Sequence, residues 1–157
     1  MPNRPITRKE RDAWKFAKEA HSGQVRKFIG LPYFDAHVKK VNEIVKRYTT
    51  DEDLLCAAIL HDVPEDCYDD YEVGLAIIEE TFGKRVSELV RELTSLKDEI
   101  DDVYDGDKAS YLSDKMTHMS DGALIIKLAD RLQNISDAFT ASERFRNKYF
   151  EETWKIV

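Results

Sequence analysis

Apolar residues recur at intervals of three and four along most of the chain, which is the spacing of one face of an α-helix. Thr7 followed by Glu10 has the pattern of a capping box and predicts a helix start. No stretch alternates apolar and polar residues with β-branched enrichment, so we expect no significant sheet. The pattern predicts helices over residues 7–21, 35–48, 54–62, 70–82, 84–95, 107–119, 121–137 and 143–157. We expect an all-α fold, a compact multi-helix bundle built as a single domain over residues 1–157.

Two segments between these helices lack the helical pattern. Glycine and proline interrupt it over residues 22–34, which we expect to form a loop that carries Arg26 and Lys27. The acidic stretch over residues 98–107 is expected to form a mobile loop. Both loops therefore separate regular helices rather than domains.

The predicted helix over residues 54–62 differs from the others because its middle, Leu54 to Leu60, is apolar on every side. A helix of this kind is expected at the centre of a fold. Pro64 lacks an N–H and disfavours continuation of the helix, which places His61 and Asp62 at its C-terminal end.

Composition and charge narrow the classes of function. Hydrophobic residues make up 42% and charged residues 35% of the 157 residues, as in an ordinary globular protein. The formal net charge of −7 argues against a nucleic-acid polymer as partner, because phosphate backbones require clustered Lys and Arg. Cys56 and Cys67 form no C-x-x-C pair. No apolar stretch is long enough for a signal peptide at the N-terminus or for a membrane span. We expect a cytoplasmic protein with reduced thiols and no membrane association, and homo-oligomerisation is left open.

The run from His61 to Asp66 places four ionisable side chains within six residues. Cores exclude such groups unless they are paired or bound to metal, although a solvated helix end followed by an acidic loop is the simpler alternative. His37 and Asp130 each lie beside the apolar face of another predicted helix. Two imidazoles and two carboxylates suit a divalent ion such as Mn²⁺, Fe²⁺ or Zn²⁺, so a metal site between helices is a hypothesis.

The helix predicted over residues 121–137 has two contrasting stripes. At helical spacing, its polar stripe consists of Lys127, Asp130, Asn134 and Asp137. Its apolar stripe consists of Leu124, Leu128, Leu132 and Ile135. The alternative to a functional polar stripe is a face exposed to solvent.

Several of these residues resemble the motifs of a known family. The order of His37, His61-Asp62 and Asp130 is similar to the H…HD…D signature of the HD-domain phosphohydrolases, an all-α, metal-dependent superfamily. Three longer motifs resemble the RelA/SpoT-type (p)ppGpp hydrolase domain over roughly residues 10–157. The first motif is His21-x-Gly23-Gln24-x-Arg26-Lys27 with Gly30-x-Pro32-Tyr33 and His37, the second is His61-Asp62-Val63-Pro64-Glu65-Asp66, and the third is Lys127-Leu128-Ala129-Asp130-Arg131-Leu132-x-Asn134.

The resemblance implies a role for each matching residue. His37, His61, Asp62 and Asp130 are implied as the ligands of one divalent metal ion, typically Mn²⁺ in this family. Glu65 and Asp66 are implied as the catalytic carboxylates, and either one could act on the water. The family's pattern places Arg26, Lys27 and Asn134 at the nucleotide, and further phosphate contacts are expected near Lys97 and near Arg146 and Lys148 or Tyr149. For each of these last positions, a solvated helix face is the alternative.

Three hypotheses for function follow. The first is hydrolysis of guanosine tetra- or pentaphosphate at its 3′-pyrophosphate, which releases pyrophosphate and GDP or GTP. The second is a related phosphatase that acts on another 2′- or 3′-phosphorylated nucleotide, such as NADPH or an adenosine 3′-phosphate. The third is a non-catalytic nucleotide-sensing module. A chain of 157 residues leaves no room for the synthetase domain of the large bifunctional enzymes, so we expect a stand-alone hydrolase.

Overall fold

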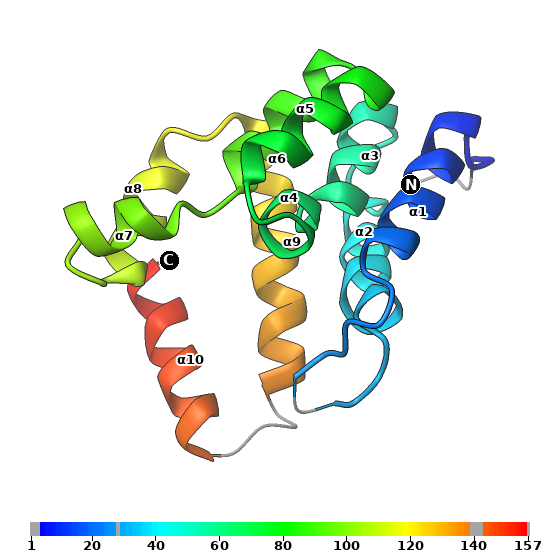
Figure 1. The fold of residues 1–157 in the computed structure, drawn as a ribbon. Coiled ribbons are helices and arrows are strands. Elements are labelled where there is room, and N and C mark those ends of the chain that lie inside the picture. Colours follow the sequence, from blue (N-terminus) through cyan, green and yellow to red (C-terminus); the bar gives the residue numbers. More distant parts are fainter. Residues whose placement is uncertain (1–3, 28, 139–142, 157) are drawn as a thin grey trace.

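Helices make up the architecture of the computed structural model, which describes residues 4–27, 29–138 and 143–156 (Figure 1). Within these ranges there is no strand, and Val25 and Pro32 form an isolated β-bridge. The all-α prediction is therefore confirmed. The elements in chain order are α1 (Arg8–Ala20), the π-helical turn η1 (Phe34–Val38), α2 (Lys39–Val45), α3 (Glu52–Leu60), α4 (Val63–Cys67), α5 (Tyr71–Phe82), α6 (Lys84–Leu93), α7 (Lys97–Val103), α8 (Lys108–Thr117), α9 (Asp121–Ala138) and α10 (Glu143–Ile156).

The central position predicted for the third helix is confirmed in α3. Every residue from Leu54 to Leu60 is at most 4% exposed, and α3 contacts α1, α2, α6 and α9. Full burial of a Leu or Ile side chain contributes about 1.5–3 kcal/mol, so this helix supplies much of the core's stability. His61 follows at 3% exposed, which carries an imidazole to the edge of the core.

Local sequence signals fix the starts of several helices. The capping box of Thr7 and Glu10 is present in both directions, as predicted. The cap of α3 is Asp51, whose side chain accepts from the amides of Asp53 and Leu54. Pro64 stands in the first turn of the short helix α4, where its missing N–H has no partner to lose. His61 and Asp62 consequently lie at the junction of α3 and α4.

The prediction of a mobile loop over residues 98–107 is wrong, because α7 occupies most of that segment. Ile100 is 9% exposed and packs with Tyr111 and Leu112 of α8 in a second, smaller hydrophobic cluster. In the sequence, Ile100 is surrounded by acidic residues, which suggested a loop. Asp98 and Glu99 instead stabilise the helix, because they lie in its first turn, at the positive end of the helix dipole.

The polar stripe of α9 faces inward and part of its apolar stripe faces solvent. Asp130 is 9% exposed, whereas Leu128 and Leu132 are 45% and 51% exposed. Helix α9 contacts α2, α3, α6 and α10, and in Figure 1 it stands in the middle of the bundle beside α10. The solvent-face alternative for the polar stripe is thus excluded at Asp130, and buried polar groups there need partners.

Candidate metal centre and catalytic cavity

Two histidines and two aspartates from three parts of the fold meet at one point. His37 comes from η1, His61 and Asp62 from the α3–α4 junction, and Asp130 from the middle of α9. One ligand atom from each of the four lies within 4.8 Å of all the others. A metal site requires His37 and Asp130 to converge on His61, and the structure brings them together.

The four side chains contact one another through the atoms that a metal ion would use. Nε2 of His37 is 2.8 Å from Oδ1 of Asp130 and 3.4 Å from Oδ2 of Asp62. Nε2 of His61 is 3.1 Å from Oδ2 of Asp62 and 3.4 Å from Oδ1 of Asp130. The four ligand atoms therefore surround a common centre.

Neighbouring groups orient the two imidazole rings. Nδ1 of His37 lies 2.6 Å from Oε1 of Gln133, and Nδ1 of His61 lies 2.7 Å from the backbone oxygen of Ala58. Both partners are acceptors, so each Nδ1 carries the hydrogen and each Nε2 is left for the centre. This is the arrangement that metal-bound histidines adopt.

The two carboxylates are held in the same way. The hydroxyl of Tyr33 donates to Oδ2 of Asp62 at 2.6 Å, and Nζ of Lys127 lies 3.4 Å from Oδ2 of Asp130. In the sequence, Tyr33 stood out only as part of a motif, and Lys127 as part of a motif and of the polar stripe. The position of Gln133 one turn after Asp130 was the only sequence signal for its contact with His37.

The charges of the cluster fit a divalent ion. Burial lowers the pKa of His37, but hydrogen bonds to Asp130 and Asp62 outweigh burial and raise it to about 9. Burial raises the pKa of Asp130, but the nearby Lys127 and the two histidines hold it well below its usual range. Positive charge between them therefore stabilises the carboxylates of Asp62 and Asp130. A divalent ion would supply that charge and leave the imidazoles neutral, as ligands must be.

Glu65 and Asp66 lie on α4 and line the same cavity as the cluster. The backbone N–H of Ser95 donates to Oε1 of Glu65 at 2.7 Å, and Nε2 of Gln24 is 3.4 Å from Oδ2 of Asp66. Enclosure by the cavity walls and the charge of Asp62 raise the pKa of both carboxyl groups. A raised pKa brings a carboxylate closer to the range of an effective general base.

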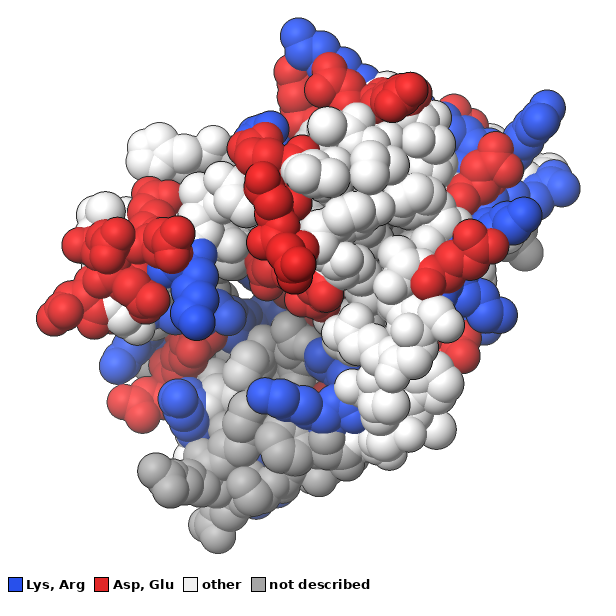
Figure 2. Space-filling model, in the orientation of Figure 1, with Lys and Arg blue, Asp and Glu red and all other residues white. Residues whose placement is uncertain are grey.

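The cavity beside the cluster has a volume of about 200 Å³ and is lined by both basic and acidic side chains. Figure 2 shows Lys and Arg side chains around the hollow and acidic side chains over its outer rim. The cations that line it are Arg26, Lys108, Lys127 and Arg131. Local positive charge of this kind can hold phosphate groups despite the negative net charge of the chain.

Arg26 is fixed against the last turns of α9. Its Nε donates to Oδ2 of Asp137 at 2.8 Å, and its guanidinium also donates to Oδ1 of Asn134. The guanidinium carbon lies 5.6 Å from the ring centroid of Tyr33. The structure therefore brings the predicted residues Arg26 and Asn134 together in the cavity.

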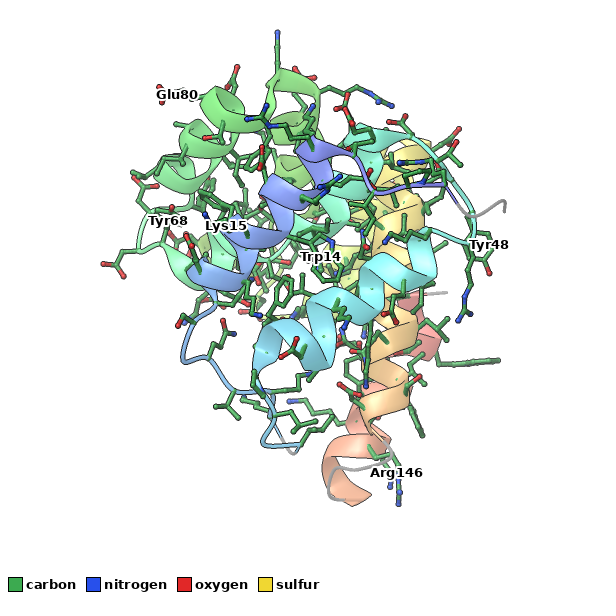
Figure 3. The ribbon with its side chains drawn as sticks, turned by 90° about the vertical axis from the view of Figure 1, so that its right-hand side faces the viewer. Trp14, Lys15, Tyr48, Tyr68, Glu80 and Arg146 are labelled. Atoms are coloured by element: carbon green, nitrogen blue, oxygen red, sulfur yellow. The ribbon has the colours of Figure 1, made fainter. Side chains whose placement is uncertain are left out.

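The other predicted substrate contacts do not line this cavity. Lys97 borders a neighbouring pocket between α4 and α7, and Lys27 and Lys148 are exposed elsewhere. Figure 3 shows Arg146 near the start of α10, at the opposite end of the molecule from Glu80 of α5. Instead, Lys108, Arg131 and Tyr149 line the cavity. Of these, Tyr149 was named in the sequence, and nothing in the spacing distinguished Lys108.

The elements and the cluster together define a class, an all-helical hydrolase whose metal centre is built from histidines and aspartates of separate helices. A family model described as "HD domain" matches residues 13–156 of the chain. The chain therefore belongs to the HD-domain family of metal-dependent phosphohydrolases. Domains of this family bind a divalent metal, which the cluster of His37, His61, Asp62 and Asp130 could hold.

Named relatives lie in one branch of this family. The chain is 32% identical over 153 residues to the guanosine-3′,5′-bis(diphosphate) 3′-pyrophosphohydrolase of Aquifex aeolicus, and 33% identical over 148 residues to the bifunctional (p)ppGpp synthase/hydrolase SpoT of Escherichia coli. These alignments cover 92% and 93% of the chain but 20% of each relative. The chain thus spans about a fifth of the length of these bacterial relatives.

A shorter relative and a solved structure match along most of their own length. The Drosophila melanogaster protein named guanosine-3′,5′-bis(diphosphate) 3′-pyrophosphohydrolase MESH1 is 31% identical over 150 residues, which cover 91% of the chain and 79% of that protein. The solved structure of a metazoan SpoT orthologue, described as hydrolysing ppGpp, superposes with a TM-score of 0.83 at 30% identity. That match covers 99% of the chain and 86% of the solved chain.

Two further observations bear on the sequence predictions. Cys56 and Cys67 are both free, as expected from their spacing, and Cys56 is buried. In the described part of the chain, the helices are too short or too polar to cross a membrane.

Proposed function

We propose that this protein is a Mn²⁺-dependent (p)ppGpp 3′-pyrophosphohydrolase, which releases pyrophosphate and GDP or GTP. One observation carries the proposal: a single cavity joins the His37–His61–Asp62–Asp130 cluster to Arg26 and Asn134 on one side and to Glu65 and Asp66 on the other. The names of the bacterial relatives and of the fly protein support the substrate. Reduced thiols and a nucleotide substrate fit a cytoplasmic location.

The proposed metal site has two nitrogen and two oxygen donors, a set that suits Mn²⁺ and also accommodates Fe²⁺ or Zn²⁺. A divalent ion held there would supply Lewis-acid activation of the phosphoryl group and of water. The contacts of Gln133 and Ala58 with the two rings keep each Nε2 directed inward.

Nucleotide binding is assigned to the Arg26 side of the cavity. Asp137 and Asn134 fix the guanidinium of Arg26, whose planar face is suited to stacking on a purine base. Lys108 and Lys127 line the same cavity and would neutralise the phosphates. The base and the phosphates are thus held by separate groups.

Hydrolysis then requires a base for the attacking water. We assign this role to Glu65, because the Ser95 amide at 2.7 Å orients its carboxylate more firmly than the 3.4 Å contact of Gln24 orients Asp66. Glu65 takes a proton as the water oxygen bonds to the phosphorus attached to O3′. The bond between this phosphorus and O3′ breaks, pyrophosphate leaves, and O3′ takes up a proton.

A substrate panel tests the proposal. Purified protein with Mn²⁺ should release pyrophosphate from ppGpp, and the Glu65→Ala/Asp66→Ala variant should lose this activity while it keeps its fold. Asp101→Ala/Asp102→Ala, which removes two exposed carboxylates from α7, is the matched control and should retain activity.

Each other result would select a different function. Orthophosphate release from NADPH or an adenosine 3′-phosphate, without hydrolysis of ppGpp, would indicate the nucleotide phosphatase. Tight ppGpp binding without turnover by a metal-loaded protein would indicate a sensing module.

A further inference from the structure

The loop between α6 and α7 supplies the hydrogen bond that orients Glu65. This bond runs from the backbone N–H of Ser95 to Oε1 of Glu65 at 2.7 Å. A loop amide can orient a carboxylate only if the loop itself is held in place. Residues 94–96 therefore need fixed contacts of their own.

Helix α8 anchors the residues on both sides of Ser95. Nζ of Lys115 donates to the backbone oxygen of Thr94, and the N–H of Leu96 donates to the hydroxyl of Tyr111 at 3.0 Å. Nζ of Lys115 also donates to the Tyr111 hydroxyl at 3.2 Å, which joins the two anchors. The Ser95 amide thus lies between two fixed points.

Lys115 is half-buried, and its ammonium group bonds to Thr94 and to Tyr111. Burial and the nearby Lys127 lower the pKa of Lys115. Removing an ammonium group from water is unfavourable unless hydrogen bonds compensate, and Thr94 and Tyr111 provide them. These two hydrogen bonds therefore tie Lys115 to the loop.

We propose that Lys115 and Tyr111 are positioning residues for hydrolysis, which act on Glu65 through the backbone of Thr94, Ser95 and Leu96. This inference rests on the proposed function of Glu65. Neither side chain lines the catalytic cavity, so neither needs to touch the substrate.

Two substitutions at one position test the hydrogen bond itself. Ser95→Pro removes the N–H, and Thr94 at φ −78° and ψ 121° already has the backbone conformation that precedes proline. Ser95→Ala keeps the N–H and is the matched control. We expect Ser95→Pro to lower kcat about 10- to 100-fold, as for loss of a hydrogen bond to a charged group, while KM and metal content stay unchanged. Ser95→Ala should lose much less kcat than Ser95→Pro, because it keeps the N–H that orients Glu65.

Substitutions on α8 test the anchor. Lys115→Met should lower kcat in the same way, and Lys115→Arg, which keeps a cationic donor, should restore part of it. Tyr111→Phe removes the acceptor for Leu96 and should also lower kcat. In a Glu65→Gln background, Lys115→Met should cause no further loss, because its effect runs through Glu65.

The outcomes separate this inference from the proposed function. Unchanged kcat in folded Lys115→Met, Tyr111→Phe and Ser95→Pro proteins, with an active wild type, would overturn the positioning role alone. A further loss from Lys115→Met in the Glu65→Gln background would also overturn it. A metal-loaded wild type that turns over no phosphorylated nucleotide would overturn the proposed function itself.

Discussion

Gly74 of α5 sets the distance between α5 and the helix that carries Glu65 and Asp66. A Cβ added at Gly74 would lie 3.0 Å from Cα of Pro64 and 2.9 Å from Cδ2 of Tyr68. Contacts this close are rare for a real Cβ, so Gly74→Ala must displace the start of α4 by a few tenths of an ångström. The backbone of Pro64, unlike a flexible side chain, cannot turn aside.

The expected effects on stability and on activity differ in size. Overpacking destabilises by about 1–3 kcal/mol, and alanine recovers up to about 1 kcal/mol through its helix propensity, so the net loss is roughly 0–2 kcal/mol. Glu65 follows Pro64 directly, so a shift of a few tenths of an ångström at Pro64 also moves this carboxylate. A displacement of about 1 Å can lower a rate about 100-fold, and this smaller shift should cost less. We therefore expect kcat to fall about 3- to 10-fold in a protein that remains folded.

The assay is steady-state pyrophosphate release at saturating metal, together with thermal unfolding and elemental analysis. Gly122→Ala is the matched control, because its Cβ would lie 2.4 Å from Cδ1 of Leu54, the mobile end of a side chain on α3. This control should lose stability but keep kcat. Unchanged kcat in Gly74→Ala, or an equal loss in Gly122→Ala, would refute the claim that α5 positions the carboxylates.

Three further predictions concern the cavity, the metal and a surface cap. Lys108→Ala should raise KM about 10-fold with a small change in kcat, since Lys108 lines the cavity as a phosphate contact; a selective loss of kcat would contradict this role. Removal of metal by a chelator should abolish turnover and lower the free energy of unfolding, by about 4 kcal/mol relative to protein at 1,000 times the metal Kd, and added Mn²⁺ should restore both. Hydrogen bonds from Arg85 hold the pKa of Asp51 below its usual range, so their stabilisation is present above pH ~4 and is lost as the pH falls through the lowered pKa. Asp51→Ala should therefore destabilise by about 1 kcal/mol at pH 7 in denaturant unfolding, and a difference that persisted undiminished at pH 2 would disagree with this pKa.

Much of the helical fold could be predicted because its signals are local. Thr7 and Glu10, which form the capping box of α1, are three residues apart. The middle of α3 is apolar on every side, so it is stable only when buried at the centre. Helix α7 could not be predicted in this way. Its apolar anchor Ile100 stands among acidic residues and is stabilised by Tyr111 and Leu112, which belong to the next helix, α8.

The candidate site shows the same division. The residue types and order of His37, His61, Asp62 and Asp130 pointed to a metal, and the structure brings their ligand atoms together. The groups that orient them could not be read from spacing. The contact between His37 and Gln133 spans 96 residues and depends on how η1 packs against α9.

The basic residues among the cavity lining depend even more on tertiary structure. Lys108 reaches the cavity because α7 and α8 fold back beside α4, whereas Lys27 and Lys148 have the same charge but lie outside it. Charge alone therefore does not identify a phosphate contact, and the packing of the surrounding helices decides it.

The central claim is that one divalent ion, held by the His37–His61–Asp62–Asp130 cluster, activates hydrolysis in this cavity. The most direct test is a titration of metal-free protein with Mn²⁺ in which bound metal and pyrophosphate release from ppGpp are measured together. The account predicts that both rise in parallel and saturate at one ion per chain, and that Asp130→Ala prevents both. Full turnover without metal, or tight binding of one ion by Asp130→Ala with undiminished activity, would contradict it.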